Sequence, residues 1–471
     1  MATVLGANSV VDSGFKVTNS VRFNDGDSSK MLKASSSVGN GYKGTLSAWV
    51  KRSAGLGVDQ QIIGQQDAGH ARIIFNNDNR LRCYGNNAGE NNAFDLASTA
   101  LFRDVGAWYH IVFAWDNTQG TAANRNKVYV NGVQLTDFAT ETYNPQNAQI
   151  GGGFFLDNKN LHVSGKSDGF FDGYMAEVVG IEGTTYAPTD FGEFDDDSGI
   201  WIPLKSVADL TFGTNGFYLD FKVSGNLGND ANGGTDFTET NVAAIDQSTD
   251  TCTNNFATFN PLNALGSNIA YSDGNLTITP GTSDYKTTAS SIAVGSGKWY
   301  AEFKAVSGHN GSTDVSIGIV GADTFLASTG SKAMSAYTNS FSYGSGGLVK
   351  QYNGSTIRTD ATYTNGDIIG IAVDMDNLKL YWSKNGTFQN SGVPTSGSTG
   401  TGAVSITAGQ PYYICAATIS SGGVKVFSAN FGSPSYSESG GNSDADGHGN
   451  FLTAPPSGYF ALNTKNLAEY G

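Results

Sequence analysis

The acidic segment EFDDDS, residues 193–198, holds the carboxylates whose spacing comes nearest to that of a glycan hydrolase. Hydrolysis of a glycosidic bond needs two carboxyl groups that flank the bond. A strand with Glu-x-Asp-x-x-Glu spacing would supply them, but Ser198 stands where the second glutamate is required. The segment also runs into Gly199 without the alternation of a strand. We therefore interpret it as a solvated or capping turn and predict that the chain is not an enzyme.

Oxygen-bearing side chains gather in several short segments, and such oxygens are the ligands that Ca²⁺ prefers. The candidate ligands in the first half of the chain are Asn24, Asp25, Asp27, Asp168 and Asp172. A similar cluster in the second half consists of Asp374, Asp376 and Asn377. None of these segments has the spacing of an EF-hand loop, and turns rich in Asp and Asn form without any ion. One bound Ca²⁺ ion in the first half is therefore one hypothesis and plain turns are the other; no other cofactor is predicted.

Histidine and cysteine residues indicate no further chemistry. The five histidines lack metal-ligand spacing: His70, His110, His162, His309 and His448. His110 falls inside an apolar run, so we expect it to be packed among strands. The three cysteines, Cys83, Cys252 and Cys415, are too scattered for a disulfide framework or a metal site, and we expect buried thiols.

Charge and hydropathy exclude two classes of partner. The formal net charge is −15 and no Lys/Arg-rich run stands against it, so we predict no nucleic-acid binding. No apolar stretch approaches the roughly 18–20 residues that a membrane-spanning helix needs, so we predict no membrane partner.

The elements that must position these residues are predicted to be short β-strands. Helical periodicity is almost absent, whereas the 62 glycines and many Asn, Ser and Thr residues stand between short apolar runs. The clearest runs span residues 44–50, 71–75, 108–115, 126–130, 297–306, 315–321, 368–375, 378–385, 412–419 and 424–432. Short strands with turns at such spacing predict an all-β sandwich or barrel.

A polar, Gly/Asn/Thr-rich region interrupts the series of strands. It is long for a loop within one compact domain, so we expect it to separate two domains. We predict a first domain over residues 1–205, an extended connector over 206–265 and a second domain with a C-terminal tail over 266–471.

Two stretches, residues 108–132 and 366–386, follow the same plan. Each has an apolar run, a short cluster of Asp and Asn that we call the Asp/Asn knot (residues 116–117 and 374–377), a second strand-like run and a closing Asn-Gly. Asp and Asn side chains accept hydrogen bonds from nearby backbone amides, and Asn-Gly supplies the positive φ angles of a tight turn. The plan predicts a hairpin in each half.

The ordered set of motifs resembles two known families. In the first half the segments GTLSAWVKR, WYHIVFAWD, KVYVNGVQL and FFDGYMAEVVGI resemble laminin-G/pentraxin-like members of the concanavalin A-like lectins. In the second half GKWYAEFKAV, IGIVG, NGDIIGIAVDMDNLKLYWSKNGTF and VFSANFG resemble an SPRY domain. The segments TNNFATFNPLN and GNFLTAPPSGYFALNTKNL resemble structural proteins of marine bacteriophages. The resemblance implies two concanavalin A-like jelly-roll sandwiches, and laminin-G-like domains often bind Ca²⁺ at the sandwich rim.

The resemblance also suggests where a ligand would bind. SPRY domains generally bind partners through loops at one end of the sandwich. The stretch over residues 343–355 reads as a loop that carries Tyr343, Tyr352 and Asn353. An aromatic ring beside polar groups is the usual platform for a sugar, so we predict that these three residues form the ligand site.

The function predicted from these observations is that of a non-catalytic virion protein. We expect a tail-fibre, appendage or capsid-surface component, made in the host cytoplasm, that recognises host cell-surface glycan and docks to other virion proteins. A homo-oligomer is expected, with a trimer favoured. A polysaccharide-degrading tail enzyme and a purely structural capsid cement protein remain as alternatives.

Overall fold

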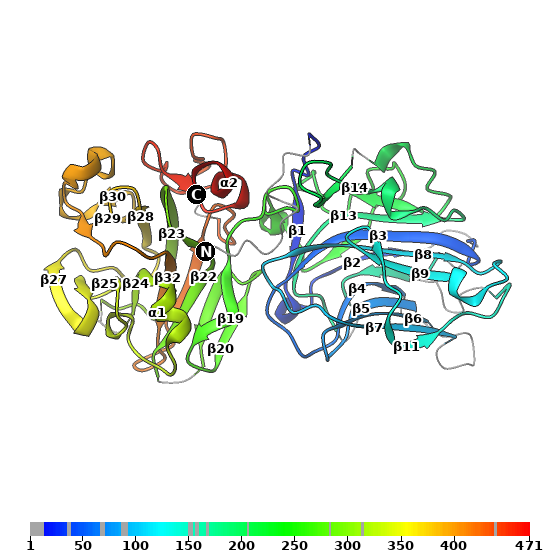
Figure 1. Cartoon of the computed structure of the whole chain (residues 1–471), viewed down its shortest axis with the longest axis horizontal. Coiled ribbons are helices and arrows are strands. Elements are labelled where there is room, and N and C mark those ends of the chain that lie inside the picture. The colour runs from blue at the N-terminus through cyan, green and yellow to red at the C-terminus, as the bar shows by residue number, and fades with distance from the viewer. Residues whose placement is uncertain are drawn as a thin grey trace. The chain divides into compact units, whose positions relative to one another are not determined.

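The computed structural model describes residues 14–34, 39–65, 71–85, 93–148, 154–155, 160–165, 169–204, 207–281, 284–311, 315–437 and 440–471. The protein is nearly all β, as predicted (Figure 1). It divides into two compact units, which we call the N-terminal unit, residues 6–253, and the C-terminal unit, residues 254–471.

The N-terminal unit contains two large antiparallel sheets within its described residues. The first has the order β10 (Val133–Gln134), β9 (Asn126–Val130), β8 (Trp108–Asp116), β3 (Lys43–Arg52), β13 (Gly173–Glu182), β1 (Ser20–Phe23) and β18 (Gln247–Ser248), with β16 (Phe217–Leu219) also on β13. The second has the order β11 (Phe138–Thr142), β7 (Phe94–Leu101), β6 (Arg80–Gly85), β5 (Ala71–Phe75), β4 (Gln60–Gln65), β12 (Asn160–Val163), β2 (Lys30–Ala34) and β17 (Thr238–Thr240). A small hairpin joins β14 (Gly192–Phe194) to β15 (Trp201–Pro203). One hydrophobic core holds residues of both sheets, such as Leu46 and Val50 of β3 with Ile73 and Phe75 of β5, as in a sandwich.

Two sheets also make up the described part of the C-terminal unit. The first, which we call the seven-stranded sheet, has the order β19 (Phe259–Leu265), β22 (Lys286–Val294), β32 (Tyr412–Thr418), β24 (Ser316–Gly321), β25 (Ser340–Gly344), β26 (Leu348–Gln351) and β27 (Ser355–Thr359). The second has the order β20 (Ile269–Ser272), β21 (Thr277–Pro280), β33 (Val426–Asn430), β23 (Lys298–Ser307), β28 (Ile368–Asp374), β29 (Lys379–Lys384) and β30 (Thr387–Phe388), with β31 (Val404–Ser405) on β29 and β34 (Phe460–Ala461) on β23. Helices α1 (Ala322–Ala327) and α2 (Thr464–Tyr470) are short. Residues of both sheets share one core, among them Ile317 and Ile414 of the first and Phe303 and Trp382 of the second.

The predicted hairpins are confirmed, and both close with the same hydrogen bonds. Asn131 and Asn385 each adopt a φ of 48° and each precedes a glycine. Asn131 exchanges two bonds with His110, from its backbone N–H (2.9 Å) and to its side-chain oxygen (2.8 Å). Asn385 does the same with Ile368, at 2.7 and 2.8 Å. Each asparagine follows the second strand of its hairpin, and these bonds extend the pairing of that strand with the first strand by one residue.

The Asp/Asn knots are turns, as interpreted from the sequence. The Asp374 carboxylate accepts the backbone N–H (2.9 Å) and the side-chain amide (2.8 Å) of Asn377. Asp116 accepts the backbone N–H (3.1 Å) and hydroxyl (2.6 Å) of Thr118 in the other hairpin. The register that follows pairs Ile371 with Trp382 and buries both completely.

The segment over residues 206–265 is not an extended connector, which corrects our prediction. Three of its strands extend the sheets of the N-terminal unit: β16 pairs with β13, β17 with β2 and β18 with β1. Phe217, Leu219 and Phe237 lie in the core of that unit. The end of the segment, β19, is an edge strand of the seven-stranded sheet. The three strands β16, β17 and β18 have only two or three residues each, too few to show a periodic pattern.

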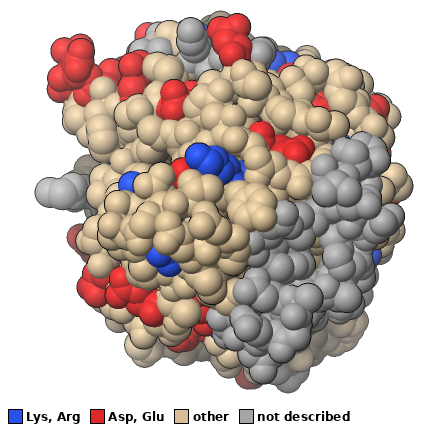
Figure 2. All heavy atoms as spheres, turned by 90° about the vertical axis from the view of Figure 1, so that its right-hand side faces the viewer, with Lys and Arg blue, Asp and Glu red and all other residues tan. Residues whose placement is uncertain are grey.

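The surface reflects the composition. On the face drawn in Figure 2, acidic side chains gather at several places and basic side chains are sparse. No helix within the described part of the chain is both long and apolar enough to span a membrane.

Candidate functional site

The acidic segment 193–198 runs from the end of β14 into the turn of the small hairpin β14–β15, which begins at Asp195. The Asp195 carboxylate accepts the backbone N–H (2.8 Å) and hydroxyl (2.7 Å) of Ser198, which lowers its pKa. Glu193 lies on β14 with its side chain exposed. The interpretation as a turn is confirmed for residues 195–198, whereas Glu193 and Phe194 lie in strand β14.

The first calcium candidates form a short 3-10 turn, η2 (Asp25–Asp27), between β1 and β2. The Asn24 side-chain nitrogen donates a hydrogen bond to the Asp27 carboxylate (2.9 Å). The Ser29 hydroxyl accepts the Asn24 backbone N–H (2.7 Å) and donates to its carbonyl (3.0 Å). These bonds close the turn from within the chain.

The other calcium candidates are placed differently. Asp172 is buried, and its charge interacts with the buried Arg52 guanidinium, whose pKa falls to about 10, mainly through burial. Asp168 lies outside the described residues. Among the described residues no group of three or more His, Cys, Asp or Glu side chains is arranged to hold a metal ion. Calcium binding by these residues stays a hypothesis.

Chelation tests that hypothesis. We expect EDTA to leave the melting temperature of the protein unchanged, because protein hydrogen bonds already close the Asn24–Ser29 turn. An ion bound well below its working concentration would stabilise the fold by a few kcal/mol, so its removal would lower the melting temperature by several degrees. Calorimetry with EDTA, and again after excess Ca²⁺ is restored, separates the two outcomes.

His110 belongs to a buried stack rather than to a catalytic pair. Its ring stacks on Trp49, and its Nδ1 accepts the Trp201 indole N–H (3.0 Å). An indole nitrogen only donates, so the proton of the neutral imidazole lies on Nε2 and is donated to the Ser47 hydroxyl (2.8 Å). A histidine that donates to the serine cannot take its proton. Burial lowers the pKa of His110 to about 3, which keeps the ring neutral.

Tyr343 is not the exposed ring that we predicted. It lies in strand β25 at 0% exposure, its hydroxyl donates to the Ala361 carbonyl, and its ring packs against Tyr363 and Trp382. The stretch 343–355 forms β26, the turn η8 (Tyr352–Gly354) and the start of β27, with no long loop. The prediction failed because Phe341 and Tyr343 alternate with Ser342 and Gly344, and the aromatic pair fills the core.

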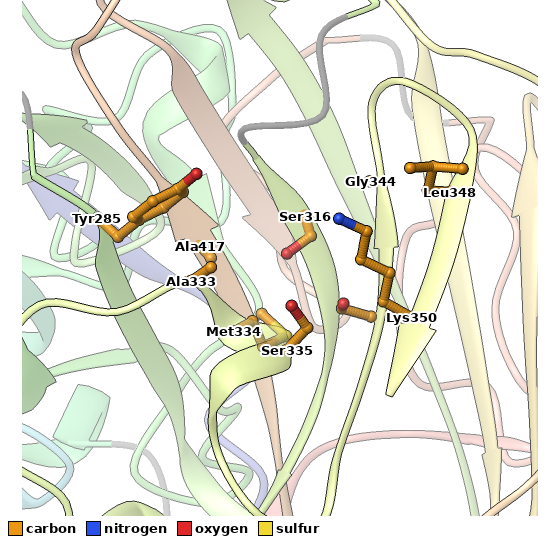
Figure 3. Close-up of a pocket in the computed structure, with 10 residues that line it drawn as sticks. Tyr285, Ser316, Ala333, Met334, Ser335, Gly344, Leu348, Lys350 and Ala417 are labelled. Atoms are coloured by element: carbon orange, nitrogen blue, oxygen red, sulfur yellow. The ribbon is translucent and has the colours of Figure 1, made fainter. Parts of the chain in front are cut away.

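The opposite face of the same strand carries the best candidate site, which we call the serine–lysine groove. It is a cavity of about 80 Å³ on the outer face of the seven-stranded sheet (Figure 3). Its lining is Tyr285, Ser316, Ala333, Met334, Ser335, Ser342, Gly344, Leu348, Lys350 and Ala417. Figure 3 shows the hydroxyls of Ser316 and Ser335 and the ammonium of Lys350 pointing into the space between them.

Strand register brings the polar residues of the groove together. Ser342 of β25 lies opposite Lys350 of β26, and Ser316 of β24 lies opposite Gly344. Gly344 has no side chain, so the sheet face is open beside Ser316. The turn η7 (Met334–Ala336) contacts β24, β25 and β26 and supplies Ser335 as a wall.

The polar side chains of the groove have unused hydrogen-bonding capacity. Within the described part of the chain, the side chains of Ser316, Ser335, Ser342 and Lys350 have no hydrogen-bond or ion-pair partner. Polar groups without protein partners are bound by water or by a ligand. The sequence alone did not identify them; the available signal was the alternation of serine with aromatic residues in SFSYG.

Tyr352 and Asn353 lie beside this groove without lining it. Tyr352 is 44% exposed, and Asn353 adopts a φ of 63° within η8. Their turn contacts η7, the wall of the groove. Two of the three predicted ligand residues therefore remain accessible at its border.

A larger hollow of about 600 Å³ lies elsewhere in the C-terminal unit. Asp376 and Gln410 line it together with Met375, Leu378 and several glycines. One Asp376 oxygen already accepts the Gly297 backbone N–H (2.9 Å). This hollow is wide and its lining is divided almost evenly between polar and apolar surface, whereas the lining of the smaller groove is mainly polar. The smaller groove is therefore the better candidate for a specific polar ligand.

Comparisons with known proteins agree with the fold of the N-terminal unit. A family model described as the concanavalin A-like lectin/glucanases superfamily matches residues 24–180. Together with the strand arrangement, this match shows a concanavalin A-like lectin fold. Among curated protein sequences, none matches the chain.

Several solved structures are similar to parts of the chain. The SPRY domain of human HERC1 is 18% identical, with 36% of this chain and 96% of that domain covered and a TM-score of 0.29. A heptameric pentraxin of Limulus polyphemus is 14% identical, with 35% and 77% covered and a TM-score of 0.26. A proposed carbohydrate-binding protein of Bacteroides ovatus is 17% identical, with 49% and 60% covered and a TM-score of 0.29.

Proposed function

We propose that the protein is a non-catalytic, glycan-binding component of a bacteriophage virion surface. The lectin fold of the N-terminal unit supports the glycan-binding part of the proposal. The virion part rests on the sequence resemblance of residues 253–263 and 449–467 to phage structural proteins. Host cell-surface glycan is the proposed ligand, and other virion proteins and further copies of the chain, as a trimer, are the proposed partners.

The serine–lysine groove is the observation that carries the glycan-binding proposal. A saccharide presents many hydroxyl groups, each of which both donates and accepts hydrogen bonds. Serine hydroxyls have the same dual capacity, and three of them lack a partner in the described part of the protein. Tyr285 lines the groove and Tyr352 stands near it, so an aromatic surface is available for the apolar face of a sugar ring.

Filling the groove tests this proposal. We expect Ser316→Tyr to weaken binding of the full chain to a host glycan at least about tenfold, because the larger side chain occupies the space that Ser335 and Lys350 border. Binding is measured on a panel of capsule and lipopolysaccharide saccharides, with circular dichroism to confirm that the variant is folded.

Ser405→Tyr is the matched control, since Ser405 is exposed on β31 of the other sheet. Equal binding by Ser316→Tyr and the wild type would place the site elsewhere and contradict the assignment of glycan binding to this groove. Release of new reducing ends from the panel would favour the polysaccharide-degrading alternative. No binding to any saccharide would favour the cement-protein alternative.

A further inference from the structure

We infer that the serine–lysine groove selects acidic saccharides, in which one carboxylate or sulfate ester pairs with Lys350. This inference rests on the glycan binding proposed above and adds the chemical class of the ligand. It follows from the charge of the groove, the direction of its polar atoms and the charge of the surrounding protein.

The described residues that line the groove include one cation and no anion. Lys350 is the only charged residue among its ten lining residues. Several other lysines of the C-terminal unit form ion pairs with aspartates, such as Lys384 with Asp367 (3.0 Å) and Lys298 with Asp374 (3.5 Å). Lys350 has no such partner within the described residues, so its charge is available to a ligand.

The position of Lys350 places its ammonium group beside the serine hydroxyls of the groove, where it can bind an anionic group of a ligand together with them. Its partner in the sheet register is Ser342, and in Figure 3 its ammonium group is directed toward Ser316. An anionic oxygen between these groups would accept a charge-assisted bond from the ammonium and ordinary bonds from the hydroxyls. A neutral sugar hydroxyl would gain only the ordinary bonds, so the groove favours the anion.

The charge of the whole protein limits the kind of anion. A net charge of −15 repels a densely charged polyanion at long range, while a single paired anion is held at short range. The expected ligand therefore carries separated acidic groups, as in a uronic-acid-containing or sparsely sulfated polysaccharide.

Paired saccharides that differ only in charge test the inference. The probes are oligogalacturonate and its methyl ester, and sparsely sulfated dextran and unsulfated dextran, with binding to the full chain measured by calorimetry. We expect the acidic member of at least one pair to bind about tenfold more tightly at 25 mM salt, and the preference to shrink at 250 mM salt. The pair that shows the preference identifies the anion as carboxylate or sulfate.

Variants locate the preference. Lys350→Met is expected to abolish the preference, so that the acidic member binds no more tightly than its neutral counterpart, and Lys350→Arg is expected to keep the preference. Lys379→Met makes the same charge change on β29 of the other sheet and is expected to leave the preference intact. Equal binding of acidic and neutral members, or a preference that survives Lys350→Met, overturns the inference while glycan binding stands. Failure of all saccharides, including the neutral panel, overturns the proposed function itself.

Discussion

Replacing Asp250 with alanine is expected to lower the free energy of unfolding of the N-terminal unit by about 3–5 kcal/mol. Asp250 forms an ion pair with Lys51 of β3 at 2.7 Å, and both side chains are only 1% exposed. Its second oxygen accepts the Trp108 indole N–H (3.2 Å). The substitution removes the carboxylate that pairs with the buried Lys51 ammonium, and breaking a buried ion pair by removing one partner is costly.

Calorimetry of the full chain measures this effect as a lower melting temperature for one unfolding transition. Asp236→Ala is the matched control, because Asp236 lies in the same segment but is exposed, and its carboxylate accepts hydrogen bonds from the Asn226 side chain and the Asp230 backbone N–H. It should cost no more than about 1–2 kcal/mol. Equal, small effects of both substitutions would mean that the segment is a loose connector and not part of the unit.

The second large effect concerns how the stability of the N-terminal unit depends on pH, where two opposing contributions are expected to cancel in the wild type. From pH 6.5 to 4.5 the stability of the N-terminal unit should change little in the wild type, because two buried groups oppose each other. His110, whose pKa burial lowers to about 3, destabilises the fold as the pH falls. Burial raises the pKa of Glu177 to about 7, although a hydrogen bond from the Tyr218 hydroxyl (2.5 Å) acts in the other direction, so Glu177 stabilises the fold as the pH falls.

The sign of each effect follows from which state binds the proton. Between pH 6.5 and 3 the unfolded chain protonates His110 and the folded chain does not, so acidification costs up to roughly 5 kcal/mol. Between pH 7 and 4.5 the folded chain keeps a proton on Glu177 that the unfolded chain releases, so acidification stabilises by up to roughly 3 kcal/mol. Below pH 4.5 the Glu177 effect ends, while the His110 effect continues.

Single variants uncover the two opposing slopes. We expect the melting temperature of Glu177→Gln to fall steadily from pH 6.5 to 4.5 and that of His110→Gln to rise over the same range. Both replacements are neutral amides that can donate and accept, so they keep hydrogen bonding to Tyr218 or to Ser47 and Trp201. Calorimetry at constant ionic strength measures the slopes, with the transition assigned by Asp250→Ala. Identical slopes in the wild type and both variants would contradict this account.

The fold class and the hairpins could be predicted from the sequence because their causes are local. Alternation places Ile369, Ile371 and Val373 on one face of β28, and all three are completely buried. The positive φ angles of Asn131 and Asn385 follow from the turn preference of Asn-Gly. Both features depend on residues that are neighbours in the chain.

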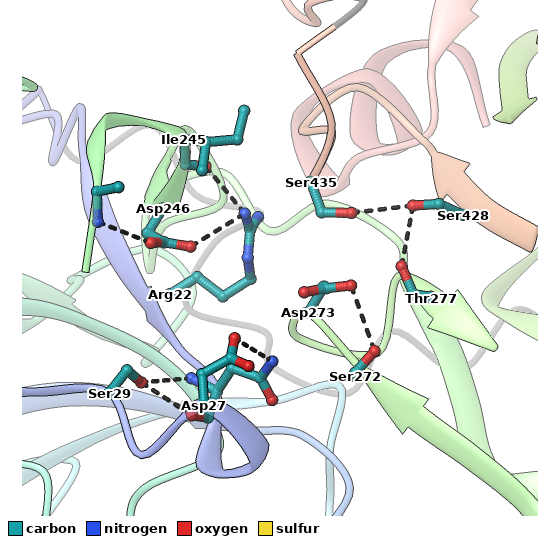
Figure 4. A network of polar contacts seen from close by, with 12 residues as sticks. Arg22, Asp27, Ser29, Ile245, Asp246, Ser272, Asp273, Thr277, Ser428 and Ser435 are labelled. Carbon is teal, nitrogen blue, oxygen red and sulfur yellow. Dashed lines mark hydrogen bonds and ion pairs between the residues drawn. The ribbon is translucent and has the colours of Figure 1, made fainter. Parts of the chain in front are cut away.

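The fate of the polar segment after residue 205 was decided by tertiary structure. Arg22 of β1 donates to the Ile245 carbonyl (2.9 Å) and pairs with Asp246 (3.5 Å), as Figure 4 shows. Lys33 pairs with the buried Asp230 at 2.8 Å in the same way. Partners about 200 residues apart in sequence leave no local pattern, so composition alone favoured a connector.

The sequence predicted one part of the candidate site, and the tertiary structure determined the rest. The sequence directed attention to residues 343–355, which supply Gly344, Leu348 and Lys350 to the lining of the groove, and it placed Tyr352 and Asn353 in a turn-like context. The sequence did not show which face of β25 would line a ligand site. Serine and aromatic residues alternate along this strand, as in Ser342 and Tyr343, and either kind of side chain can contact a sugar. Pairing with β24 and β26, together with the turn η7, put Tyr343 in the core and assembled Ser316, Ser342 and Lys350 on the outside. A groove built from separate strands exists only once their register is fixed, and non-local packing fixes that register.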